Sequence, residues 1–317
     1  MKRKVIRQGH NTLTLTLPAK WVADNKISPG DELDLRVSEK NIIIGKEAED
    51  RPKKITIDIN GLDYSSIRHR MRSAYKVGYD EIELRFDRPD APEFKSGKNR
   101  PVMDVINHEV GMLLGCEIVD QKSKHCTIKD YTFGNHDDLD NLMRRIFLLF
   151  VDYNDELYEA VKKDDRNILE TMYEKHFNVT KFIFYLIRSL NKGKYPEPRK
   201  IPVLYYIFSG IDDMLDISKY VAIRILKLQP EKLNKTSIEI LGDIVELIKT
   251  YYQYFFKPED EYMLRFSKKR WDVVRKLTRS IRTVPPEELF VLTQMEQCLE
   301  ILHHLFEARM SLNYCRQ

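Results

Sequence analysis

The sequence has few cysteines and no long hydrophobic run, and both shortages narrow the class of protein. The four cysteines, Cys116, Cys126, Cys298 and Cys315, show no paired spacing. This excludes a disulfide framework and a cysteine-based zinc site, and it favours a reducing, cytoplasmic location. The apolar runs near 182–187 and 203–211 fall far short of the ~20 residues that a membrane-spanning helix needs. The start of the chain has no apolar core of a signal peptide, so we expect no membrane insertion.

Familiar catalytic motifs are also missing. His108 is followed by Glu109, but Met112 stands where a metalloprotease helix has its second histidine. The sequence offers no phosphate-binding glycine loop, no nucleophile elbow and no serine–histidine–aspartate order. We therefore expect a protein that is not an enzyme.

Positive charge is concentrated at the N-terminus. The net charge of +4 arises from 53 basic and 49 acidic residues. Residues 1–23 contain no acidic residue, whereas the two signs are nearly balanced over 134–317. A positive field confined to one end indicates an anionic partner there, the alternative being an ordinary solvated terminus.

The first segment has the pattern of a small β-rich module. Threonine and leucine alternate over 12–17, which predicts a strand, and Pro18 suits the first position of a short helix over 19–25. A turn at 28–31 leads to strands over 33–37 and 42–44. A unit of about 45 residues without disulfides or metal rarely buries enough surface to fold alone. Its apolar residues need a partner surface, either a second copy of the chain or the rest of the same chain.

A polar linker over 47–52 leads into a segment that mixes strands and helices. The helix predicted over 64–77 places Ile67, Met71, Ala74 and Tyr75 on one face, and Gly78 ends it. The succession of strands and helices along this segment predicts a small α/β domain, but the order of the strands in its sheet cannot be read from the sequence. The other predicted elements are strands over 55–59, 82–86, 116–120 and 126–131, a helix over 102–114, and a loop over 88–101.

The remainder of the chain is predicted to be helical. Chain breakers near 163–165, 191–202, 230, 258 and 285–286 separate about six helices of ~25 residues, each ~38 Å long. The residues Met172, His176, Val179, Ile183, Leu186 and Leu190 follow the spacing of a helix-bundle seam. We interpret His176 as a core histidine rather than a metal ligand.

Carboxylates four residues apart occur in both halves of the helical region. Asp212 with Asp216, and Glu296 with Glu300, leave one face of a helix and could share a hard cation. Each member of the first pair lies 84 residues before its counterpart, which indicates a duplicated three-helix unit. Carboxylates on helices are more often simply solvated. The complete set of predicted metal ligands is Glu174, Asn178, Asp212, Asp216, Asp272, Glu296, Glu300 and Glu307.

The N-terminal residues resemble a known family. The segments 4–9 (KVIRQG), 15–22 (LTLPAKWV) and 27–33 (ISPGDEL) are similar to the SpoVT/AbrB swapped-hairpin domain. The resemblance implies a homodimer of interleaved strands that presents basic residues to DNA. The bacterial members carry two arginines in the short helix, where this chain has Val22 and Ala23. The predicted DNA contacts are therefore Lys2, Arg3, Lys4, Arg7, His10 and Lys20.

The helical part resembles the PhoU-like proteins. The segments 212–216 (DDMLD) and 296–300 (EQCLE) fall where PhoU repeats carry Glu-Arg-Ile-Gly-Asp, and Glu307 matches a later glutamate. The stretch 75–82 is similar to the segment between the two modules in archaeal fused proteins. The resemblance implies two three-helix bundles, divalent or ferric ions at the acidic motifs, and contact with a phosphate transporter subunit or sensor kinase. Asn178, Ile223 and Lys268 depart from the pattern of carboxylates.

Together these features predict an α+β multidomain protein. The expected domains are a swapped-hairpin module over 1–46, a small α/β domain over 53–133 and a PhoU-like pair of three-helix bundles over 134–317. The leading hypothesis is a dimeric DNA-binding transcriptional regulator of phosphate uptake. The alternative is an accessory protein that modulates a transporter or kinase without touching DNA.

Overall fold

The computed structural model describes residues 2–9, 11–38, 41–45, 52–132, 138–228 and 232–315. It confirms the α+β class, with a small strand-rich N-terminal part and a mostly helical remainder. The chain divides into two compact units, Met1–Pro52 and Lys53–Gln317. The predicted linker over 47–52 coincides with this division, whereas the predicted boundary at 133–134 falls outside the described residues.

The N-terminal unit consists of two hairpins and a short helix. Strand β1 (Ile6–Gln8) pairs antiparallel with β2 (Thr12–Thr14), and β3 (Asp34–Ser38) pairs with β4 (Asn41–Gly45). Helix α1 (Ala19–Asp24) follows Pro18, as the sequence predicts. The alternating segment forms a strand only as far as Thr14, because β1 supplies partners for just the three residues of β2.

The second unit begins with a four-stranded sheet in the order β5-β6-β10-β9. Strands β5 (Lys54–Asp58) and β6 (Glu81–Arg85) are parallel, and β10 (His125–Asp130) runs antiparallel to both β6 and β9 (Cys116–Lys122). Helix α2 (Tyr64–Val77) connects β5 to β6, and α3 (Val102–Val110) precedes β9. This strand order was not readable from the sequence.

Helix α2 illustrates how local sequence sets an element of this domain. The Asp63 carboxylate accepts hydrogen bonds from the backbone N–H groups of Ser65 and Ser66, which caps the first turn. Gly78 ends the helix with a φ of +105°, a left-handed conformation that favours glycine. The predicted face of Ile67, Met71, Ala74 and Tyr75 is buried in full.

Two details of this domain differ from the prediction. The segment predicted as a loop over 88–101 contains a hairpin of β7 (Asp90–Glu93) and β8 (Lys98–Pro101). Among the described residues of β7 and β8, Ala91 is the one buried apolar side chain. The sequence therefore has no alternating pattern that would predict this hairpin. The predicted helix over 102–114 ends at Val110, because turns around Gly111 and Gly115 lead the chain into β9.

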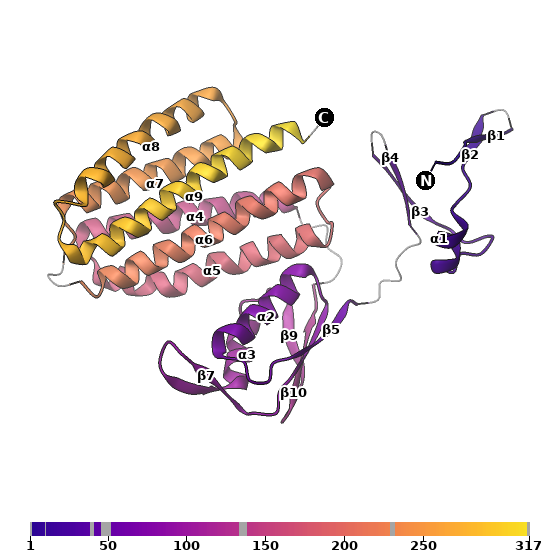
Figure 1. Ribbon diagram of the computed structural model, residues 1–317, viewed down its shortest axis with the longest axis horizontal. Coiled ribbons are helices and arrows are strands. Elements are labelled where there is room, and N and C mark those ends of the chain that lie inside the picture. Colours follow the sequence, from indigo (N-terminus) through magenta and orange to yellow (C-terminus); the bar gives the residue numbers. More distant parts are fainter. Residues whose placement is uncertain are drawn as a thin grey trace. The chain divides into compact units, whose positions relative to one another are not determined.

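Within the described residues, six long helices form the rest of the second unit (Figure 1). Helices α4–α6 pack on one another, as do α7–α9, and the two groups meet where α4 contacts α7 and α6 contacts α9. This is the predicted pair of three-helix bundles. The helices are α4 (Leu139–Lys163), α5 (Arg166–Asn191), α6 (Ile201–Ile225), α7 (Lys235–Phe256), α8 (Asp260–Ser280) and α9 (Leu289–Tyr314).

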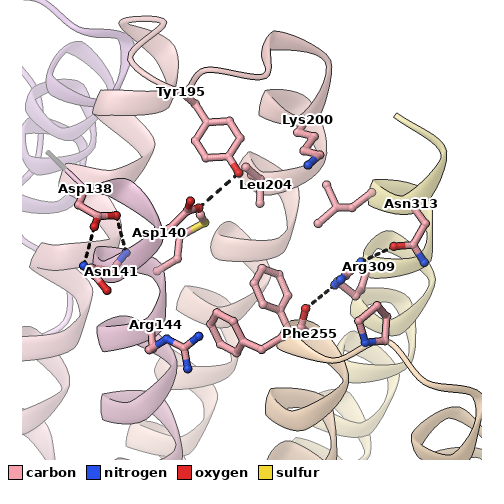
Figure 2. Close-up of a pocket in the computed structure, with 14 residues that line it drawn as sticks. Asp138, Asp140, Asn141, Arg144, Tyr195, Lys200, Leu204, Phe255, Arg309 and Asn313 are labelled. Atoms are coloured by element: carbon pink, nitrogen blue, oxygen red, sulfur yellow. Dashed lines mark hydrogen bonds between the residues drawn. The ribbon is translucent and has the colours of Figure 1, made fainter. Parts of the chain in front are cut away.

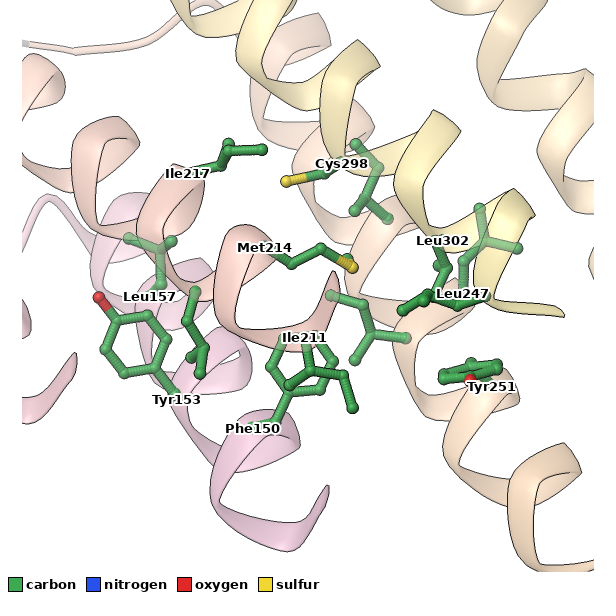
Figure 3. Packing of buried hydrophobic residues seen from close by; sticks show 14 of the residues in the cluster. Phe150, Tyr153, Leu157, Ile211, Met214, Ile217, Leu247, Tyr251, Cys298 and Leu302 are labelled. Atoms are coloured by element: carbon green, nitrogen blue, oxygen red, sulfur yellow. The ribbon is translucent and has the colours of Figure 1, made fainter. Parts of the chain in front are cut away.

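One continuous hydrophobic core joins the two bundles. Figure 3 shows Phe150 of α4, Met214 of α6, Tyr251 of α7 and Leu302 of α9 packed together at its centre. All six residues of the predicted α5 seam are buried, including His176. The chain therefore buries its helical apolar faces internally.

The α/β domain is attached to the bundle through α2 and α5. Phe184 of α5 belongs to the core of the α/β domain, and the Arg188 side chain is only 2% exposed. The Arg188 guanidinium donates to the carbonyls of Tyr75 and Tyr79 and to the carboxylates of Asp80 and Asp130, at 2.6–2.9 Å. A buried arginine with this many acceptors fixes the orientation of the two parts within the unit.

In the part of the chain that the structure describes, none of the helices has both the length and the apolar character needed to cross a bilayer.

Candidate functional site

The N-terminal unit leaves its apolar residues exposed. Leu13 is 70% exposed, Leu35 63% and Val37 77%, and none of the described side chains of this unit is buried. The other large apolar side chains exposed here are Val5, Ile6, Leu15 and Ile42. So much apolar surface on so small a unit marks an interaction surface.

The predicted DNA-binding residues lie on the same unit. Lys2, Arg3, Lys4, Arg7 and Lys20 are all exposed, and His10 lies outside the described residues. Arg7 is on β1 directly across from Leu13 of β2, and Lys20 is in the first turn of α1. Flexible, exposed ammonium and guanidinium groups suit contacts with phosphate oxygens, which give affinity without reading base sequence.

The first acidic motif lies where α6 faces α5 and α2. Nε2 of His176 and Oδ1 of Asp216 are 2.8 Å apart, and Lys219 donates to the same carboxylate oxygen. The Thr180 hydroxyl lies 3.2 Å from the same histidine nitrogen. Asp216 is thus engaged by two groups of the protein itself, and His176 is a buried partner of Asp216 as well as a core residue.

The pKa values around this motif diverge. The His176 and Lys219 partners outweigh burial and hold the pKa of Asp216 well below its usual range. Burial raises the pKa of Asp212 to about 6, although nearby Lys76 of α2 opposes the shift. Burial also lowers the pKa values of His176 and Lys76. At neutral pH the ionised Asp212 is therefore poorly solvated, and its Oδ1 is buried without a hydrogen-bond partner within the described structure.

The second acidic motif is also bound by protein cations. Arg270 donates to Glu300 at 2.6 Å, and Arg275 donates to Asp272 at 2.5 Å. Glu296 and Glu307 are exposed on α9. In the first half, Glu174 is exposed, and the Asn178 side chain accepts from Lys181 at 3.3 Å.

The predicted metal ligands therefore do not converge. Among the described residues, no three histidine, cysteine, aspartate or glutamate side chains are placed to hold one ion. Cations of the protein contact Asp216, Asp272 and Glu300. Metal binding stays a prediction from the sequence, and no step below depends on it.

Sequence reasoning missed the cations that face the first acidic motif. Lys76 lies in the last turn of α2, and nothing in the local sequence placed it near Asp212. The Lys76 ammonium lies 4.1 Å from the ring centre of Phe184, and Arg72 and Arg68 both bond the buried Glu109. These contacts join elements far apart in the chain, and periodicity carries no signal for them.

Comparison with known proteins supports the N-terminal assignment. Residues 6–58 match the family model described as antidote-toxin recognition MazE, bacterial antitoxin. No curated protein gives a match to the chain. The matched residues include both hairpins and α1 and end with β5. The N-terminal unit is thus similar to a MazE antitoxin domain, which supports the predicted swapped-hairpin module.

Proposed function

We propose that this protein is a dimeric DNA-binding regulator of phosphate uptake, with the helical region as its sensing or partner-binding part. The observation that carries the proposal is the exposed apolar surface of the N-terminal unit beside an acid-free basic segment. The similarity of residues 6–58 to an antitoxin domain supports the dimer and the nucleic acid. The resemblance of the acidic helix motifs to those of PhoU is the reason for proposing that the regulated process is phosphate uptake.

Dimerisation and DNA binding follow from one arrangement. A second copy that interleaves its strands would bury Leu13, Leu35 and Val37, each worth about 1.5–3 kcal/mol when fully buried. The two-fold axis would double the lysines and arginines and set them in a symmetric array. Each neutralised phosphate contributes about 0.9 to the slope of log affinity against log salt, so doubling the contacts strengthens binding steeply at low salt.

Fluorescence anisotropy with promoter DNA of phosphate-transport genes tests the proposal. The full chain should bind at low salt with an affinity that falls as salt rises. A variant with Lys4, Arg7 and Lys20 changed to alanine should bind more weakly and with a shallower salt slope. The matched control changes Lys162, Lys163 and Arg282 to alanine, which removes the same charge from exposed positions of the helical unit. Absence of binding at low salt, or equal losses in both variants, would contradict the proposal.

A specific observation favours an accessory protein as the second candidate. Helix α1 carries Val22 and Ala23 at the positions where bacterial members of the SpoVT/AbrB family have arginines. In that case the N-terminal unit only dimerises, and the helices dock on a transporter subunit or sensor kinase. The triple alanine variant distinguishes the two candidates, because regulation of phosphate uptake in cells should survive it only if DNA is not contacted.

A further inference from the structure

The end of the helical bundle where α4 and α6 begin and α7 and α9 end contains an open cavity of about 770 Å³. Figure 2 shows its wall, with Arg144, Lys200 and Arg309 on three sides. These cations come from α4, the 3-10 turn Pro198–Lys200 and α9, which only the packing of the bundle brings together. The residues that line the cavity all belong to the second unit and include none of the predicted metal ligands.

Arg144 is the cation best placed to receive a ligand. Its guanidinium lies over the Phe256 ring, 4.5 Å from the ring centre. Within the described structure no carboxylate or other acceptor is bonded to it, so its N–H donors are available. An arginine held flat on an aromatic ring keeps its edge free for the oxygens of an anion.

Arg309 and Lys200 are held in place by the protein. The Arg309 Nε donates to the Phe255 carbonyl at 2.6 Å, and its second nitrogen donates to Asn313 at 2.9 Å. Burial lowers the pKa of Arg309, which indicates a cation with little compensating negative charge around it. The Lys200 side chain is mostly buried and reaches Glu197 on its own turn.

The carboxylates of the same wall are already engaged. Asp138 accepts from the backbone and side chain of Asn141 as the N-cap of α4. Asp140 accepts from the Tyr195 hydroxyl at 3.4 Å. These hydrogen bonds fix the positions of Asp138 and Asp140, which keep their charge. An anion would therefore be held by Arg144 and Arg309, next to Lys200 in its ion pair with Glu197.

We propose that this cavity binds a phosphorylated small molecule of about nucleotide size. The guanidinium groups of Arg144 and Arg309 match phosphate oxygens in geometry, and Lys200 adds a third positive charge. The volume lies within the ~300–1,000 Å³ of ligand pockets and far exceeds the space that one orthophosphate fills. The Phe255 and Phe256 side chains offer apolar surface for the rest of the ligand. The site stands on this geometry alone, whatever the N-terminal unit binds.

Isothermal titration of the full chain with ATP, AMP, pyrophosphate, orthophosphate and sulfate tests the site, each with and without Mg²⁺. We expect binding of a nucleotide that is tighter than binding of orthophosphate or sulfate. Arg144→Gln should weaken it at least about tenfold, the effect of losing one charge-assisted contact. Lys200→Gln should act in the same direction.

Arg145→Gln is the matched control. Arg145 is the next residue of α4, is also exposed, and lies over the Phe182 ring at 4.7 Å without lining the cavity. The affinity of the Arg145→Gln variant for the nucleotide should equal that of the unchanged protein. The proposal is overturned if none of the nucleotides binds, if orthophosphate or sulfate binds as tightly as ATP, or if Arg145→Gln weakens binding as much as Arg144→Gln. Thermal unfolding of each variant establishes that it is folded.

Discussion

In the unit Lys53–Gln317 the large apolar side chains lie mainly in two continuous cores, whereas in Met1–Pro52 seven of them lie exposed and none of the described side chains is buried. Both units have the apolar periodicity of folded structure. The difference lies in what covers the apolar face, since helices of the same chain cover each other but two-stranded hairpins have no second layer. An amphipathic pattern therefore indicates that a face needs a partner and does not say whether the same chain supplies it.

The largest expected effect is the loss of dimerisation when the exposed apolar surface of the N-terminal unit is made charged. Leu13→Asp should convert a dimer into monomers, with association weakened at least about 100-fold, because a symmetric interface loses the leucine twice. Light scattering after size exclusion over a range of concentrations measures this.

Leu264→Asp on α8 is the control for that change. Leu264 is 69% exposed, nearly the same as Leu13, but it lies in the unit that already has its core. Its oligomeric state should not change. A Leu13→Asp protein that remained dimeric would show that another surface holds the copies together.

The next effect concerns the attachment of the α/β domain to the bundle. Arg188→Met removes the donor to Oδ2 of the buried Asp130 carboxylate and to the carbonyls of Tyr75 and Tyr79, and should cost about 3–5 kcal/mol of the free energy of unfolding. Urea denaturation followed by circular dichroism measures the loss. Arg145→Met, at an exposed position, should change the free energy by less than about 0.5 kcal/mol. Equal losses in both variants would mean that the buried arginine does not join the two parts.

The smallest effect is a pH-dependent one at the first acidic motif. The pKa of Asp212 is raised to about 6 in the folded protein, above its ordinary 3.8. The folded state then binds this proton more tightly than the unfolded state, so Asp212 favours folding below pH 3.8 and loses that contribution as pH rises through 6. Asp212→Asn should stabilise the protein by about 1–2 kcal/mol at pH 8 and by almost nothing at pH 4.

Thermal melts at both pH values, with Asp213→Asn as the control, measure this gain. Asp213 is the next residue of α6 and is exposed, so its change should matter less. The comparison of variants at one pH also removes the opposing contribution of His176, whose lowered pKa destabilises the fold as pH falls. A gain that stayed constant from pH 4 to pH 8 would contradict the raised pKa.

Much of the fold could be predicted because it depends on short-range patterns. The alternation over 12–17, the buried face of α2 and the seam from Met172 to Leu190 each follow from a period of two or 3.6 residues. The hairpin of β7 and β8 escaped prediction because one buried alanine gives no period. The metal-ligand hypothesis used spacing along a helix, but it could not foresee that Lys219, Arg270 and Arg275 would engage those carboxylates.

The sequence by itself determined the type of most elements, the buried faces of α2 and α5, and that the basic N-terminal module carries an apolar face in need of a partner. Only the tertiary structure decided that Lys76 faces Asp212, that Arg188 reaches Asp80 and Asp130, and that three cations surround one cavity. The reason is physical. Periodicity records whether a side chain points inward, whereas its neighbours on other elements depend on how helices cross and sheets stack, which no local pattern of residues specifies.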